Sequence, residues 1–73
     1  MTTTADRDQI RTTMVRAINR LDYLGFIPTR DATLNLAADM LDIPMHIVGE
    51  YGDVEYPDWY ENMACEIWHE LAA

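Results

Sequence analysis

Apolar residues repeat at helical spacing in the first third of the chain. Five of them, separated by four, three, four and three residues, define the pattern: Ile10, Met14, Ala17, Leu21 and Leu24. This spacing places all five on one face of an amphipathic helix. Gly25 follows at a position where helices commonly end. The pattern predicts a helix over about residues 6–24, and residues 1–5 are expected to be a disordered lead.

The end of the chain gives a second clear helix. Asp58 is a suitable N-cap, and Glu61, three residues later, has the spacing of a capping box. One face of the predicted helix 58–72 is apolar: Tyr60, Met63, Ala64, Ile67 and Leu71. Trp59 and Trp68 fall at the margins of this face, where aromatic residues either close a core or anchor a partner.

Between these helices, the stretch from Asp31 to Tyr51 has the apolar pattern of two short helices joined at a tight corner. Pro44 cannot continue the first of them, since it has no N–H, but it suits the first position of a new helix. The pattern predicts helices over about residues 30–41 and 45–51.

This stretch resembles a helix-turn-helix over residues 31–51. The resemblance is carried by a small residue in the first helix, two apolar residues around the turn and two on the second helix: Ala38, Leu41, Ile43, Val48 and Tyr51. Asp42 stands where the family usually has Gly. The second helix offers Met45, His46, Gly49 and Glu50 instead of the side chains that read DNA bases. The resemblance implies, as an alternative function, a DNA-binding transcriptional regulator that acts as a dimer.

The fold expected from these segments is all-α, a single domain over residues 1–73 built as a small bundle of three to four helices. The alternative is an α+β fold with a short hairpin at residues 46–56. In that segment Ile47, Val48, Val54 and Tyr56 surround two glycines, which is typical of a hairpin.

Charged residues are distributed unequally along the chain. The net charge is −8, from thirteen acids and five arginines. All the arginines lie in the first thirty positions, and residues 31–73 contain ten acids with neither Lys nor Arg. A field of this sign repels phosphates and favours a basic partner. We therefore expect no direct binding to nucleic acid.

The function expected is that of a small acidic protein-binding module. It would be an inhibitor or adaptor that occupies a basic surface of a partner protein, one that normally holds nucleic acid. In size and charge the chain is similar to small acidic phage inhibitors, such as anti-CRISPR proteins. The residues expected to contact the partner are Asp39, Asp42, Glu50, Asp53, Glu55, Asp58, Trp59 and Trp68.

Catalysis and cofactors are not expected. Cys65 and His69 have the spacing of two metal ligands on a helix, but a structural zinc needs four ligands. No Gly-rich loop that could cradle a phosphate is present. A single Cys fits a reducing compartment, and no apolar run has the length of a membrane span. The chain is expected to be cytoplasmic, and it could form a homodimer.

Overall fold

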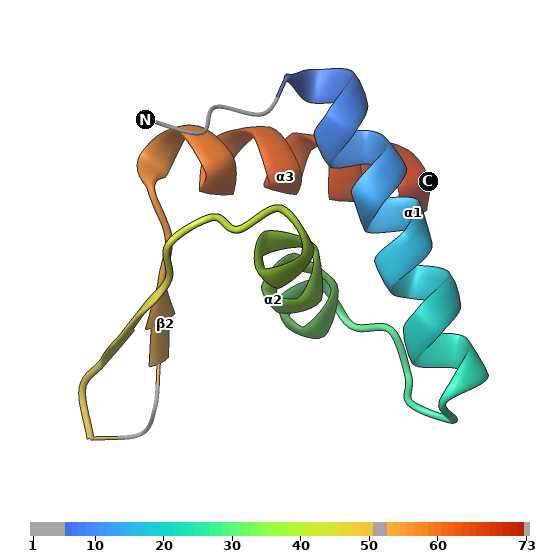
Figure 1. Ribbon diagram of the computed structural model, residues 1–73, viewed down its shortest axis with the longest axis horizontal. Coiled ribbons are helices and arrows are strands. Elements are labelled where there is room, and N and C mark those ends of the chain that lie inside the picture. Colours follow the sequence, from blue (N-terminus) through green and yellow to red (C-terminus); the bar gives the residue numbers. More distant parts are fainter. Residues whose placement is uncertain (1–5, 51–52, 73) are drawn as a thin grey trace.

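The computed structural model describes residues 6–50 and 53–72. Over these residues the chain forms three helices with an antiparallel hairpin between the second and the third: α1 (Arg7–Tyr23), α2 (Arg30–Met40), β1 (His46–Val48), β2 (Asp53–Glu55) and α3 (Asp58–Ala72). In Figure 1, α3 crosses above α2, α1 descends along one side, and the hairpin projects on the other. The lead predicted to be disordered, residues 1–5, lies outside the described residues.

Both ends of α1 are fixed by hydrogen bonds that the sequence specifies. Asp6 accepts the N–H of Gln9 at 2.8 Å, and the Gln9 side chain accepts the N–H of Asp6 at 3.0 Å, which completes a capping box. At the other end Gly25 has φ of 87°, and the N–H of Phe26 donates to the carbonyl of Leu21 at 2.9 Å. This is a Schellman motif. The helix predicted over residues 6–24 is confirmed.

The end of α2 repeats that motif without glycine. Asp42 has φ of 56°, and the N–H of Ile43 donates to the carbonyl of Ala38 at 2.9 Å. Asp is one of the few residues other than Gly that visit this left-handed region. The turn brings Ile43 back into the core, where it is buried.

The helix predicted over residues 45–51 is wrong, since β1 begins at His46. Its residues pair with β2 in the register His46 to Glu55, Ile47 to Val54 and Val48 to Asp53. A seven-residue helix would be too short to be stable by itself, and its β-branched pair Ile47 and Val48 favours a strand. Gly49, with φ of 80°, begins the turn. Tyr51, the last residue of the predicted helix, lies outside the described residues.

The molecule is therefore mostly helical with a small hairpin, which agrees with the alternative expectation for residues 46–56. The segment that resembles a helix-turn-helix has its first helix and its turn. A strand follows where the second helix would begin.

The core lies where the three helices meet. Its buried apolar residues come from all three and from the turn after α2: Ile10, Met14, Ala17, Leu34, Ala37, Ala38, Ile43, Tyr60, Ala64 and Ile67. Tyr60 is fully buried, and its hydroxyl donates to the carbonyl of Leu34 at 2.6 Å. This bond joins the start of α3 to the middle of α2. The apolar stripe predicted for the last helix lies in this core or packs against it. Of the stripe predicted for the first helix, Ile10, Met14 and Ala17 are buried, whereas Leu24 is 52 % exposed.

Replacing Asp42 with glycine should stabilise the protein. A left-handed conformation costs an L-residue about 1–2 kcal/mol, and Asp42→Gly removes that cost while adding flexibility to the unfolded chain. We expect a gain of about 0.5–1 kcal/mol in the free energy of unfolding, measured by urea denaturation.

Asp39→Gly is the matched control, since it removes the same charge from within α2. It should cost about 0.5–1 kcal/mol. A loss of stability in Asp42→Gly as well would contradict this explanation of the turn.

Candidate functional site

Nearly all of the net charge resides in one stretch of the chain. Residues 39–61 carry seven acids and neither Lys nor Arg, a net charge of −7. The other fifty residues carry six acids and five arginines, a net charge of −1. We call the first set the acidic face: Asp39, Asp42, Glu50, Asp53, Glu55, Asp58 and Glu61.

The structure places these acids from the end of α2, along the hairpin, to the first turn of α3. Six of the seven are exposed: Asp39, Asp42, Glu50, Glu55, Asp58 and Glu61. Asp53 is the first residue of β2, and its side chain lies outside the described part of the chain. Among the described residues, no ion pair involves an acid of this face. Its exposed carboxylates are therefore unneutralised by the protein itself.

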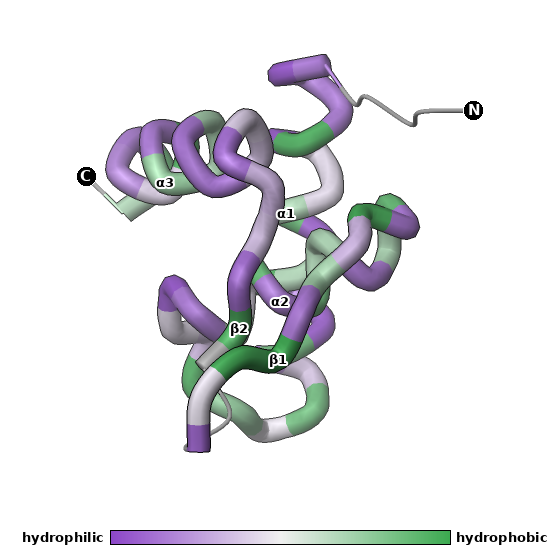
Figure 2. Tube along the Cα trace, turned by 90° about the vertical axis from the view of Figure 1, so that its left-hand side faces the viewer, coloured by the Kyte–Doolittle hydropathy of each residue, from purple (hydrophilic) through white to green (hydrophobic). Residues whose placement is uncertain are grey.

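The hairpin adds apolar and titratable side chains to the acidic face. His46 is paired with Glu55 in the register and lies on the same side of the hairpin, as does Val48. Ile47, on the other side, is 78 % exposed. Figure 2 shows the hairpin in front of α2, with hydrophobic residues along β1. A partner at this face would meet apolar area beside the carboxylates.

The hairpin is anchored at its base by aromatic residues. The hydroxyl of Tyr56, just after β2, donates to the side-chain oxygen of Asn35 on α2. The Tyr56 ring also lies 5.4 Å from the Tyr60 ring, centroid to centroid, at an interplanar angle of 58°. Burial, with Asp31 and then Glu61 nearby, raises the pKa of Tyr56. These contacts hold the acidic hairpin against the helical core.

The two tryptophans lie on opposite edges of α3. Nine residues separate Trp59 from Trp68, which at about 100° per residue is half a turn beyond two full turns. Both are partly buried and pack against the core, and Trp59 meets Tyr60 edge-on with centroids 6.1 Å apart. Of the two, Trp59 adjoins Asp58 of the acidic face, while Trp68 is about two and a half turns further along.

Two arginines that a DNA-binding function would need form ion pairs with carboxylates of the same chain. Arg7 contacts Glu66 at 3.1 Å and Glu70 at 2.7 Å, and Arg11 contacts Glu70 at 2.7 Å. Hydrogen bonds to Glu66 and Glu70 raise the pKa of Arg7. The network joins α1 to α3, so phosphates would have to displace these carboxylates.

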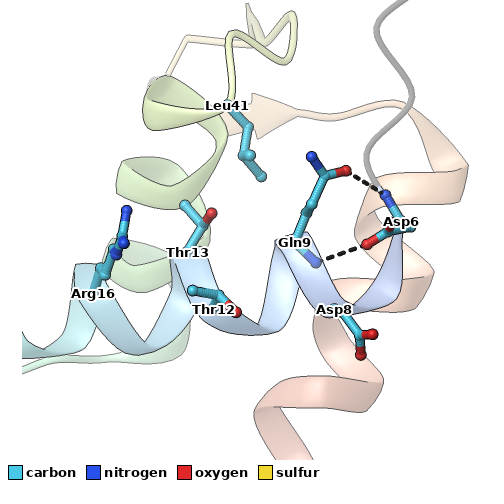
Figure 3. A pocket seen from close by; sticks show the side chains of 7 residues that line it. All are labelled: Asp6, Asp8, Gln9, Thr12, Thr13, Arg16 and Leu41. Atoms are coloured by element: carbon cyan, nitrogen blue, oxygen red, sulfur yellow. Dashed lines mark hydrogen bonds between the residues drawn. The ribbon is translucent and has the colours of Figure 1, made fainter.

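The remaining chemistry-bearing groups do not converge. Among the residues described, no group of three or more His, Cys, Asp or Glu side chains could hold a metal ion. Cys65 is a half-buried free thiol. An open hollow of about 360 Å³ lies beside the first half of α1. Leu41, from the end of α2, also lines it (Figure 3). Asp6 on its wall already caps α1.

Some residues of this surface were not anticipated from the sequence. The capping box predicted for Asp58 and Glu61 is wrong, because α3 begins at Asp58 and the N–H of Glu61 donates to the carbonyl of Pro57 at 3.0 Å. Glu61 is instead exposed, as Asp58 is. His46 and Ile47 joined the surface only because their segment is a strand. The apolar residues around Gly49 and Gly52, which favour the alternative hairpin at residues 46–56, are the signal that identifies them.

Comparison with known proteins identifies no relative of this chain. No protein-family model, curated protein or solved structure matches this chain. Within the described residues, none of the helices combines the length and the apolar character that crossing a membrane requires. The function is therefore inferred from the chemistry of the acidic face.

The anchor of this surface should fail at alkaline pH through Tyr60. Burial, and then Tyr56 and Cys65, raise the pKa of Tyr60, whereas a tyrosine in the unfolded chain ionises near pH 10. The stability that neutral Tyr60 provides is therefore complete below about pH 10 and is lost as the pH rises towards the folded pKa. The loss is about 1.4 kcal/mol per pH unit, measurable by urea denaturation between pH 8 and pH 11.

Tyr60→Phe should cost about 1 kcal/mol at neutral pH, because it removes the hydrogen bond to Leu34, and it should flatten the alkaline loss. Tyr23→Phe, at an exposed side chain, is the matched control and should keep the loss. The same alkaline slope in Tyr60→Phe as in the wild type would contradict this assignment.

Proposed function

We propose that this chain is a small acidic protein-binding module, an inhibitor or adaptor whose acidic face occupies a basic surface of another protein. The observation that carries the proposal is the concentration of charge: −7 of the net −8 lies in residues 39–61. None of the described ion pairs of the protein neutralises it.

Unpaired carboxylates contribute little to the stability of the monomer but can contribute to the binding of a partner. Within the monomer they repel one another, whereas cations of a partner would relieve that repulsion. A concentration of negative charge also steers a basic partner towards the protein during diffusion and repels anionic partners. Such a surface favours a partner rich in Arg or Lys.

The anchoring of the hairpin also supports binding. Because Tyr56 ties the end of β2 to Asn35 on α2, the acids near the base of the hairpin need little ordering when a partner arrives. Preorganisation of this kind lowers the entropic cost of association. Val48, on the same side of the hairpin as Glu55, would add desolvated apolar contact beside the charges.

The class of partner that fits the acidic face best is a protein with a basic surface that normally holds nucleic acid. Carboxylates on a fixed scaffold present negative charge as phosphates do, and the size and charge of the chain resemble those of small phage inhibitors of the anti-CRISPR kind. The alternative, a DNA-binding regulator, has less support. Its second helix is a strand, and Arg7 and Arg11 are engaged with α3.

The test compares two variants of equal net charge for binding to a fluorescent deca-arginine peptide at about 50 mM salt. Glu50→Lys/Glu55→Lys reverses two charges on the acidic face, and Asp8→Lys/Asp22→Lys reverses two on α1. We expect the wild type to bind the peptide, the first variant to bind roughly tenfold more weakly, and the second to lose much less. Circular dichroism checks that both variants are folded.

Two results would contradict the proposal. One is equal weakening in the two variants, which would mean that net charge alone attracts the peptide. The other is binding of the wild type to random-sequence duplex DNA in place of the peptide, since at this salt concentration even a non-specific phosphate binder gives a signal.

A further inference from the structure

The connection between α1 and α2 exposes a group of large apolar side chains. Tyr23 is 88 % exposed, Leu24 52 %, Phe26 62 % and Ile27 83 %. We call these four residues the apolar corner. Single exposed apolar residues are ordinary, but four within five positions form a patch of the kind that marks an interaction site.

The exposure of the apolar corner is built into a fixed backbone. The Schellman motif at Gly25 sets the direction in which the chain leaves α1. The N–H of Thr29 then donates to the carbonyl of Ile27 at 2.9 Å, and the Thr29 hydroxyl caps α2. Both ends of the connection are thus held by hydrogen bonds, and the apolar side chains are presented outward by a defined turn.

The apolar corner is the neutral region of an acidic protein. Residues 20–31 contain two Arg and two Asp, a net charge of zero, and Arg30 contacts Asp31 at 3.4 Å. Figure 1 places this connection at the foot of α1, on the other side of the molecule from the hairpin. The chain therefore separates a neutral apolar surface from a strongly acidic one.

We infer that the apolar corner is the interface of a homodimer, in which the corner of one copy packs on the corner of a second copy. A two-fold contact of this kind places the same patch on both sides. Neutral surface then meets neutral surface, Arg20 of each copy can approach Asp22 of the other, and the two acidic faces point apart. Any contact through residues 39–61 would instead bring two charges of −7 together.

The charge of the chain also argues against other occupants. A basic protein is drawn first to the acidic face, and an anionic membrane repels a chain of net charge −8. A chain of 73 residues buries a smaller share of its surface on folding than a larger domain does, so pairing at the apolar corner would remove apolar area that the monomer leaves exposed. The inference does not depend on the proposed function, although a dimer would carry two acidic faces and could bind a repeated basic surface with avidity.

The first test is sedimentation equilibrium of the wild type and of two matched variants. Ile27→Asp and Ile47→Asp each replace a highly exposed isoleucine by an acid, the first in the apolar corner and the second on the hairpin. We expect a wild-type dimer, an association constant at least about tenfold lower for Ile27→Asp, and no comparable loss for Ile47→Asp. A wild type that is monomeric at millimolar concentration, or equal losses in the two variants, would overturn the inference.

The second test uses charge exchange, which does not depend on the apolar side chains. Arg20→Glu makes the region around the apolar corner acidic, and Asp22→Arg makes it basic. Each variant alone should dimerise more weakly than the wild type, and an equimolar mixture should form a heterodimer. A mixture that associates no better than its components would overturn the inference, as would a monomeric wild type that binds phosphatidylglycerol vesicles through this corner.

Discussion

The buried tyrosine at the start of α3 is the contact on which the arrangement of the chain depends. Tyr60 is fully enclosed, and its hydroxyl reaches the carbonyl of Leu34 in the middle of α2. Because its ring also packs against Tyr56, the hairpin that precedes α3 is brought to the same place. A single side chain thus fixes one helix against another and sets where the hairpin emerges.

This arrangement has an electrostatic consequence. With the hairpin held at one side of the molecule, the acids of the hairpin lie there, away from α1, whereas Leu41 at the end of α2 lines the same hollow as Arg16 of α1 (Figures 1 and 3). The arginines of α1 lie elsewhere, and Arg7 and Arg11 are used to join α1 to α3. The fold therefore keeps the acids of the hairpin apart from the arginines of α1. The apolar corner, at the far end of α1, is the region where positive and negative charges balance.

Sequence reasoning succeeded where structure is decided locally. The spacing of apolar residues and the helix end at Gly25 were enough to predict α1, and the position of the turn at Asp42 followed from the pattern around it. It failed at residues 45–51, where a proline suited to a helix start competes with the β-branched residues Ile47 and Val48, whose strand partners lie seven and five positions away. The exposure of single apolar side chains could not be predicted either, because whether Ile27 is covered depends on tertiary packing. The ion pairs of Arg7 join residues about sixty positions apart, so no local pattern predicts them.

The most direct test of the account is a nuclear magnetic resonance titration of the isotope-labelled protein with the deca-arginine peptide. The account predicts that backbone amide shifts change mainly within residues 39–61, across the end of α2, the hairpin and the first turn of α3. Changes should be small in α1 and in the second half of α3. Shifts distributed evenly over the three helices, or concentrated in α1, would contradict the claim that the separated charge forms a binding surface.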